Sequence, residues 1–505
     1  MIKTATDYHF STSYDRYDMK GHFLDWENQP NVYKAYPGIE AIPLPKVTDF
    51  PKSSLREVAR MQIDLSDTAR LDFNCLSQIF SLSYSLTARS RHGAEHFYYR
   101  SAASAGALYP NEIYLGAYDI DNLQPGLYHY GIGNADLTPL RIGNFSRFTA
   151  AATGLAAALE PAATFFITGI FFRSAWKYRA RAFRYVLLDA GHVLENLLLA
   201  LRANGLGYTV HYNFDDEKLG ELIGLDPKKE VCLACVNVTC ANVKGTPSTQ
   251  SHPNGTIDRL SYEIIEASRV SKKEIVYDEI QQTYRAGIPV DRDPNFEMIQ
   301  QFGITPKTWI PIQADKDSES VMGYPEAVFS RRSKRNYVDK DLSQKKFLNL
   351  LELVCIELTQ DASFEPGTLS SMTTGFLTGN VEGVAPGFYL LNPQQREAGL
   401  VREGPYIEKM TPVCLNQDWL HNASLHFVFM TSLSILDACR GPRGYRYAMM
   451  NAGCLGQAVY LGAAALGLGC CGIGAFYDGE AIDLLGLNNE SVMLYLVAAG
   501  PVKRL

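Results

Sequence analysis

The sequence contains one long segment twice. Residues 446–488 align with residues 184–226 at a constant offset of 262, and 14 of the 43 aligned positions are identical, including an Arg-Tyr pair and several glycines. A shorter motif, PGLYHY at 125–130, returns as PGFYLL at 386–391 with an offset of 261. A repeat of this length is too long for a solenoid. It predicts two similar domains that fold against each other as a covalent, intramolecular pseudo-dimer.

Length and composition are those of an ordinary globular protein. The 505 residues are enough for two to four domains, and 46% of them are apolar, which is ample for conventional cores. The net charge of −7 provides no basic field, so nucleic acid is excluded as a partner and any anion must be held by a local cluster. Ten cysteines without a disulfide framework, and no signal peptide in MIKTATDYHF, predict a cytoplasmic location.

The run from Ala448 to Phe476 is apolar enough to suggest a membrane span. Its twin segment argues against a membrane, because the twin carries Asp189, His192, Glu195 and other polar residues at matching positions. We therefore expect two buried, small-residue-rich helices, each ending at a glycine turn.

The order of predicted elements lacks the alternating strand-helix pattern of a doubly wound fold. We expect an extended arm over the first domain at 1–50, domain 1 at 51–240, a linker region at 241–320 and domain 2 at 321–505. Helical spacing covers 55–86, and the linker contains helices near 262–269 and 274–284. The polar segment 86–112 is predicted as a loop. Buried strands are expected at 112–120, 161–172 and 230–240.

Cys232 and Cys235 form a CxxC motif inside a predicted strand. Residues three apart on a strand point to opposite faces, so both thiols cannot serve one metal ion. We expect them to pack in the core, and the sequence predicts no metal site.

A basic cluster opens the second domain. Arginines 331, 332 and 335 surround Ser333 and Lys334, and convergent guanidinium groups with a hydroxyl suit a phosphate. The alternative is a solvated helix start. A second basic pair, Lys503 and Arg504, ends the chain; such tails are commonly just solvated.

Two small-residue segments could approach a ligand closely. The loop SAASAGALYP at 101–110 offers backbone amides around Ser104, Gly106 and Ala107, which could lie against a planar heterocycle or simply turn tightly. The turn GLGCCGIGAF at 467–476 follows a helix, so it lacks the helix N-terminus that a dinucleotide fingerprint requires. A Rossmann fold is therefore excluded.

Lys177 and Tyr178 are adjacent, and Arg179, Arg181 and Arg184 follow closely. Neighbouring cations should help the lysine to lose its proton and the tyrosine to form phenolate, which would suit proton transfer near neutral pH. Ordinary surface residues are the alternative.

Together these pieces resemble the FMN-dependent nitroreductase fold family, and most closely its branch of SagB-type (ThcOx) dehydrogenases, the azoline oxidases of modified-peptide biosynthesis. The resemblance rests on the arm SYDRYDMKGHFLDWENQPNVYKAYPG, the loop SAASAGALYPNEIYL, the segment WKYRARAFRYVLLDAGHVLENL and the turn GLGCCGIGAF. In that family two protomers build each FMN site together. The resemblance therefore implies an α+β fold in which each domain has a mixed, mainly antiparallel sheet flanked by helices. It also implies that two domains of one chain build the FMN site here.

Carried over by motif, the resemblance implies an asymmetric pair of sites. The second domain would supply the cofactor-binding residues Arg331, Arg332, Ser333, Arg335, Gly472, Ile473, Gly474, Lys503 and Arg504. The first domain would supply Ser104, Ala105, Gly106 and Ala107, with Lys177 and Tyr178 as catalytic base or proton shuttle. The first-domain counterparts LREVARMQIDLS, GLGYTVHY and NVKGT lack these features, and the second-domain loop has changed to a segment like SSMTTGFLTG. One composite FMN site per chain is expected.

The implied activity is two-electron transfer through flavin N5 with a small-molecule or peptide substrate. The chain has Ala103 where family loops often have proline, and it shows no recognisable peptide-clamp module. Two alternatives follow: an NAD(P)H-dependent reductase of nitro compounds, quinones or flavins, and a flavin-binding scaffold protein with little turnover.

Overall fold

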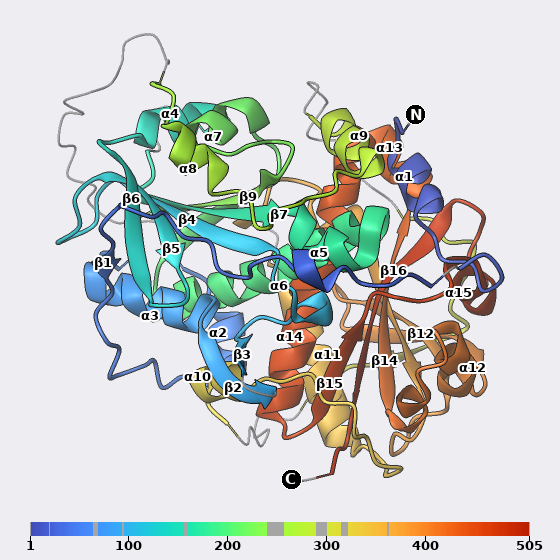
Figure 1. Cartoon of the computed structure of the whole chain (residues 1–505). Helices are drawn as coiled ribbons and strands as arrows, with labels where there is room; N and C mark the ends of the chain where they lie inside the picture. The colour runs from blue at the N-terminus through green and yellow to red at the C-terminus, as the bar shows by residue number, and fades with distance from the viewer. Residues whose placement is uncertain are drawn as a thin grey trace.

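Two sheets of equal size lie on either side of a central pair of helices (Figure 1). The computed structural model describes residues 2–19, 21–63, 69–92, 95–155, 160–239, 257–288, 300–314, 322–360 and 363–503. The largest core of buried aliphatic and aromatic side chains contains residues of both sheets and of the central helices, and two smaller cores contain residues of one sheet each and of shorter helices. The predicted α+β class and the two-domain organisation are confirmed.

Both sheets have seven strands in the same topological order, and every strand pair is antiparallel. The first sheet runs β1 (Ile42–Pro43), β6 (Asp136–Ile142), β5 (Gly126–Gly131), β4 (Asn111–Ala117), β7 (Ala163–Ile170), β9 (Glu230–Thr239), β8 (Gly207–His211). The second runs β10 (Thr308–Pro311), β13 (Glu397–Glu403), β12 (Gly387–Asn392), β11 (Thr373–Thr378), β14 (Leu425–Ser432), β16 (Ser491–Gly500), β15 (Gly469–Ile473).

The helices repeat in the same way. In the first half they are α1 (Ala5–Ser11), α2 (Leu55–Arg60), α3 (Phe73–Ser83), α4 (Ser146–Ala152), α5 (Phe171–Tyr178), α6 (Ala182–Ala203), α7 (Asp216–Ile223), α8 (Tyr262–Glu266) and α9 (Asp278–Ala286). In the second half they are α10 (Tyr324–Ser330), α11 (Gln344–Leu358), α12 (Tyr406–Val413), α13 (Leu433–Arg440), α14 (Gly444–Ala465) and α15 (Asp478–Leu485). Adding 262 to the bounds of α5, α6 and α7 gives the bounds of α13, α14 and α15.

The long helices α6 and α14 touch at their backbones. A Cβ placed on Gly191 would stand 2.1 Å from the carbonyl oxygen of Met450, and one on Gly453 would stand 2.2 Å from that of Leu188. The two glycines are themselves related by the offset of 262, so each helix presents the same position to the other. Only glycine permits this approach, and it brings the two domains into direct contact.

Two reciprocal ion clusters flank this crossing. In each, a buried aspartate at the start of a short helix in one domain binds two buried arginines near the start of the long helix in the other. The clusters consist of Asp478 with Arg181 and Arg184, and of Asp216 with Arg443 and Arg446.

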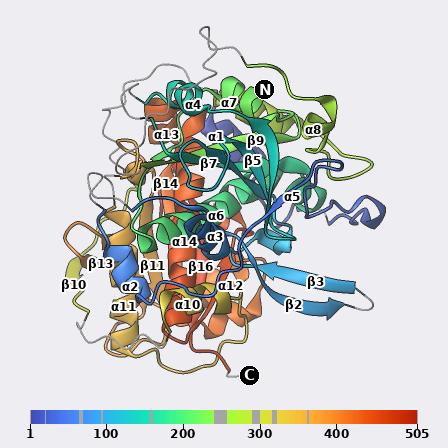
Figure 2. The ribbon, with the colours of Figure 1, turned by 90° about the vertical axis from the view of Figure 1, so that its left-hand side faces the viewer.

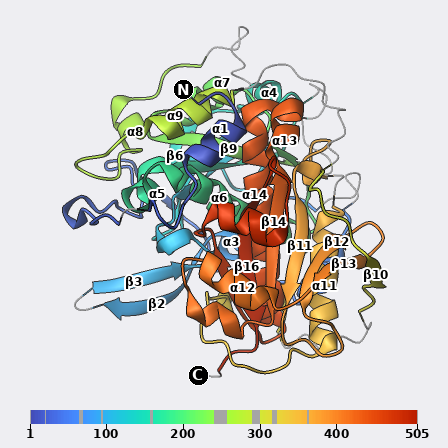
Figure 3. The same ribbon diagram turned by 90° about the vertical axis from the view of Figure 1, so that its right-hand side faces the viewer.

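Several predicted elements need correction. The segment 86–112, expected to be a loop, contains the hairpin β2 (Leu86–His92) and β3 (Glu95–Arg100), which projects from the body in Figures 2 and 3. Polar and aromatic residues alternate along its strands, as in a two-stranded ribbon. The glycine in this segment led to the prediction of a loop. The expected helix over 55–86 is two helices, α2 and α3.

The N-terminal arm does not lie over the first domain alone. The backbone amide of Ala5 donates to Asp437 of the second domain (2.6 Å), while Tyr8 donates to the carbonyl of Ala180 in the first (2.7 Å). Helix α1 therefore begins beside α13, as Figure 1 shows at the upper right. The proposed linker also contributes β10, an edge strand of the second sheet. The domain boundaries remain a prediction.

The prediction that Cys232 and Cys235 point to opposite faces is wrong. Their sulfur atoms lie 3.9 Å apart as free thiols in one core cluster. A β-bulge opposite Ile167 and Thr168 adds a residue to β9 and returns Cys232 to the face of Cys235. Both residues pack in the core, as expected.

Within the described part of the chain, no helix is long and apolar enough to cross a membrane. The apolar α14 instead packs between α6, α11 and the second sheet.

The helix crossing gives a stability prediction. Gly191→Ala should lower the free energy of unfolding by about 1–3 kcal/mol, because its methyl group has no room beside Met450. Gly220→Ala is the matched control: it lies in α7 with nothing within 4 Å of the new Cβ and should raise stability by about 0.5–1 kcal/mol. Urea unfolding of the two variants checks both signs, and equal effects would contradict the close approach.

Candidate active site at the domain interface

The basic cluster of the second domain meets the first domain directly. Arg331 is buried, and its guanidinium donates to the carbonyl oxygens of Ser101 (2.6 Å) and Arg100 (2.8 Å). Arg332 donates across the interface to the carbonyl of Thr87 (2.7 Å). The segment after α10 thus lies against the start of loop 101–110, which is defined here as the site loop.

Ser333 and Gly472 are linked by a residue that the sequence analysis did not select. The hydroxyl of Tyr460, on α14, lies 2.9 Å from Ser333 Oγ and accepts from the backbone amide of Gly472 at 2.7 Å. The equivalent position in the first domain, at the offset of 262, is Leu198. This difference between otherwise similar helices was the available signal.

The glycines of the turn make room for tyrosines. A Cβ on Gly472 would stand 1.8 Å from the hydroxyl of Tyr495, and one on Gly474 would stand 2.6 Å from the ring of Tyr185. Ile473 between them is buried. Tyr185 also donates to the carbonyl of Gly474 at 3.2 Å, so a first-domain side chain supports this second-domain turn.

Lys177 and Tyr178 lie at the end of α5, under the tip of the site loop. A Cβ on Gly106 would stand 2.8 Å from the hydroxyl of Tyr178 and 3.2 Å from Nζ of Lys177. Gly106 has φ +64°, which also favours glycine. The structure therefore brings the two predicted catalytic residues together with the predicted loop residues Ser104, Ala105, Gly106 and Ala107.

The pKa values of the pair shift in opposite senses. Burial, with the nearby charge of Arg335, lowers the pKa of Lys177. Burial, with the influence of Asp189 and Tyr14, raises the pKa of Tyr178 well above its usual value. The expectation of a phenolate at Tyr178 is therefore wrong, because Arg181 and Arg184 turn away to Asp478 instead. Lys177 is the group that can lose a proton.

Arg335 reaches Lys177 from the second domain. Its guanidinium lies 5.6 Å from the ring centroid of Trp419. Burial raises the pKa of the Cys471 thiol, and the charge of Arg335 acts against that rise. Arg335, Ser333 and Gly106 are all exposed. Arg335 of the second domain is near enough to Lys177 of the first for its charge to lower the pKa of that lysine.

The C-terminal tail is placed differently from the other predicted residues. Lys503 lines a cavity of about 740 Å³ with Lys334, Lys340 and Lys346. Ser333 and Lys334 are neighbours in extended backbone, so Lys334 faces away from Tyr460. Arg504 lies outside the described residues.

Arg331 and Arg332 form no ion pair with an acidic side chain among the described residues. Burial lowers the pKa of Arg331, and the same cause, with the charge of Arg331, lowers that of Arg332. The groups that act on these two arginines are each other, tyrosines and a cysteine. Buried cations without carboxylate partners favour an anionic ligand.

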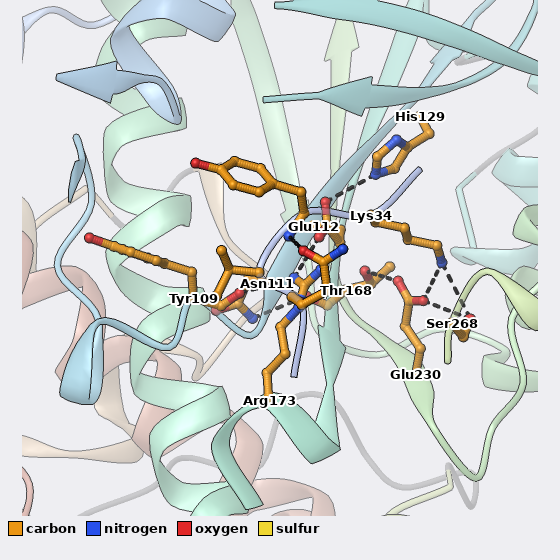
Figure 4. A network of polar contacts seen from close by, with 12 residues as sticks. Lys34, Tyr109, Asn111, Glu112, His129, Thr168, Arg173, Glu230 and Ser268 are labelled. Carbon is orange, nitrogen blue, oxygen red and sulfur yellow. Dashed lines mark hydrogen bonds and ion pairs between the residues drawn. The ribbon is translucent and has the colours of Figure 1, made fainter. Parts of the chain in front are cut away.

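A buried polar network fixes the far end of the site loop (Figure 4). Arg173 on α5 donates to the carbonyl of Tyr109 (3.0 Å) and pairs with Glu112, which also lies 3.0 Å from His129. Burial would raise the pKa of Glu112, but the charges of Arg173 and His129 hold it well below its usual range. The loop is thus fixed to the first sheet.

The sequence repeat relates the candidate site to a second region of the domain interface, and this second region is closed. Val210 of β8 forms a β-bridge with Phe364, and Glu365 accepts from Tyr447 (2.8 Å) and from the amide of Asn213. Because β11 corresponds to β4, the counterpart of the site loop is 363–372, and the segment SSMTTGFLTG assigned from sequence lies too far along the chain. This region is filled by the protein itself.

The ion cluster at Asp478 supports the turn. Burial would raise the pKa of Asp478, but Arg181 and Arg184 hold it well below its usual range. Arg181 also donates to the carbonyl of Gly474 at 3.2 Å. The turn and the interface therefore share one anchor.

Replacing this anchor should be costly. Asp478→Asn leaves two buried arginines without a counter-charge and should lower the free energy of unfolding by about 3–5 kcal/mol. Glu480→Gln removes a more exposed pair with Arg16 and should change it by no more than about 1 kcal/mol. Denaturant unfolding measures both; a small effect of Asp478→Asn would contradict the anchoring role.

Comparisons with known proteins agree with this architecture. The model of the nitroreductase family matches residues 67–238 and 328–500. A proposed nitroreductase of Methanocaldococcus jannaschii is 25% identical over 173 residues, which cover 34% of this chain and 87% of that protein.

Two further proteins are similar to this chain, over different fractions of their own length. The trifolitoxin-processing protein TfxB of Rhizobium leguminosarum bv. trifolii is 24% identical over 232 residues, or 42% of this chain and 60% of that protein. A solved nitroreductase-like structure from Anabaena variabilis has a TM-score of 0.78 at 24% identity and covers 99% of this chain and 100% of its own. The family model covers well over half of the sequence in two copies, and the chain belongs to the nitroreductase family.

Proposed function

We propose that the chain is an FMN-dependent oxidoreductase with a single composite site between its two domains. The observation that carries the proposal is the meeting of Lys177, the site loop and the cation cluster at the domain interface. Family membership supports oxidoreduction, and FMN is the cofactor we infer.

The residues present fit FMN. Arg331 and Arg332 are cations that lack an acidic partner in the described part of the chain, which suits a phosphate. Ser333 and Arg335 are exposed beside them and would complete the phosphate or ring contacts. Gly106 and the backbone around it would border the flat ring. When bound, FMN would supply two-electron chemistry by accepting or donating a hydride equivalent.

The residues of the chain would manage the proton. Lys177, whose pKa is lowered, would take a proton from the substrate as its hydride equivalent leaves. Burial and the charge of Arg335 both lower the pKa of Lys177 and so favour its neutral form. This arrangement suits dehydrogenation of an azoline-type ring, on a peptide or a small molecule, as in the SagB-type branch. The name of one relative, a trifolitoxin-processing protein, supports a role in processing another molecule.

A second candidate is NAD(P)H-driven reduction of nitro compounds or quinones. The observation that favours it is the position of Tyr178 beside the loop tip, where its phenol stays protonated and can donate a hydrogen bond to a substrate oxygen during reduction. The two candidates use the same pair in opposite directions. A flavin-binding scaffold with little turnover would need neither residue.

Cofactor binding gives the first test. The purified chain should bind about one FMN, and Arg335→Ala should weaken binding about ten- to a hundredfold by removing a charge-assisted contact. Lys340→Ala, in the separate lysine-lined cavity, is the control and should leave affinity unchanged. Absorbance and quenching of flavin fluorescence measure both. Two flavins per chain would refute the composite site.

The proton-transfer pair gives the second test. Lys177→Met should slow dehydrogenation of an azoline substrate by about 10²–10⁴-fold with flavin content unchanged, whereas Tyr178→Phe should mainly slow NAD(P)H-driven reduction. Because Lys177 must be neutral to act, the dehydrogenation rate should rise with pH. Exposed Arg179→Ala serves as the control. Stopped-flow flavin reduction reports the rates; unchanged rates in both variants would favour the scaffold.

A further inference from the structure

The site loop holds strained backbone. Besides Gly106, the non-glycine residues Ala107 (φ 54°) and Tyr109 (φ 48°) adopt positive φ. Such residues cost free energy and persist only where surrounding contacts hold them. Arg173 and Tyr109 fix one end of the loop, so the other end needs an anchor of its own.

That anchor is Asp189, a buried residue on α6. Its carboxylate accepts from Ser104 Oγ (2.5 Å) and from the backbone amide of Ala105 (3.1 Å). Ser104 Oγ in turn accepts from the amide of Tyr109 (2.9 Å), so Ser104 joins Tyr109 to Asp189. Both ends of the strained segment therefore converge on one carboxyl group.

The second domain has an amide at the same position. Asn451, at the offset of 262, donates through Nδ2 to the carbonyl of Thr368 (2.6 Å) and to Ser371 Oγ (3.0 Å). It holds the counterpart loop in the region that is closed. An amide cannot titrate, so the two copies differ in whether the loop anchor can change its charge.

We propose that Asp189 is a positioning residue that acts as a pH-dependent latch: its neutral form holds the site loop against Lys177 and Tyr178, and its ionised form releases it. The latch acts through Gly106, which touches both residues. Its relevance to catalysis rests on the proposed function, whereas the loop movement itself does not.

The direction of the pH dependence of loop closure follows from the burial of Asp189. Burial raises the pKa of Asp189 to about 7, against hydrogen bonds from Ser104 and Ala105 that lower it. An open loop would hydrate the carboxyl and return its pKa toward the ordinary value. The closed loop therefore binds the proton more tightly than the open loop, and closure weakens as pH rises through about 7.

Other titratable groups face the same space. They are Tyr109 at the loop end, Tyr178 on α5 and Tyr495 on β16, whose pKa values are all raised by burial. His192, one turn along α6, has its pKa lowered to about 4 by burial and stays neutral in the relevant range. Lys177 contacts the loop tip and has a lowered pKa. The experiment must therefore separate Asp189 from Lys177.

Hydrogen exchange of the chain without added flavin tests the latch, whether or not the proposed function holds. After correction for intrinsic rates, amides 104–109 should exchange about tenfold faster at pH 8 than at pH 6. Asp189→Asn should abolish this step and keep the slow rate throughout. Glu195→Gln removes another buried carboxyl from α6 and should keep the step.

A second variant guards against a folding defect in the first. Ser104→Ala removes the hydroxyl that joins Tyr109 to Asp189 and should give fast exchange already at pH 6. A wild-type loop without a pH step, or a step that survives Asp189→Asn, would overturn the proposal. A step lost in Lys177→Met but kept in Asp189→Asn would assign the titration to Lys177.

Discussion

The backbone contact between Gly191 and Gly453 is the constraint on which the rest of the molecule depends. It lets α6 and α14 approach until carbonyl groups and Cα atoms touch, and this fixes where each domain meets the other. The aspartate clusters on either side can then reach across with buried charge on both sides of the crossing. Without this close approach, Arg331 of the second domain would not reach the carbonyls of Arg100 and Ser101 in the first.

Much of the architecture could be predicted from the duplicated pattern. Matching glycines and matching apolar segments indicated two related domains, and the long buried helices were located within a few residues of their observed ends. The hairpin at 86–100 was missed because its alternation was short and interrupted by glycine. The approach of Cys232 to Cys235 depended on a β-bulge, which pairing between strands creates and which a single strand's sequence does not reveal.

For the candidate site too, the sequence located the motifs but not the contacts of their side chains. Motifs located the loop, the arginines, the turn and the Lys-Tyr pair, since each is continuous in sequence. The directions of the side chains were decided by packing: Lys503 and Lys334 turn to a separate cavity, and Tyr178 is buried where a phenolate was expected. Tyr460, Tyr495 and Asp189 could not be predicted, because their contacts join segments that lie far apart in the sequence.

Asp189 and Asn451 occupy the same position in the two copies of one fold, and this has a consequence for how such a site could arise. In a homodimer a substitution appears in both subunits, so a carboxyl group gained at one interface is gained at the other. Joining the copies in one chain removes that coupling, and each position can then change alone. One interface could close permanently around an amide while the other kept a group that can gain or lose a proton.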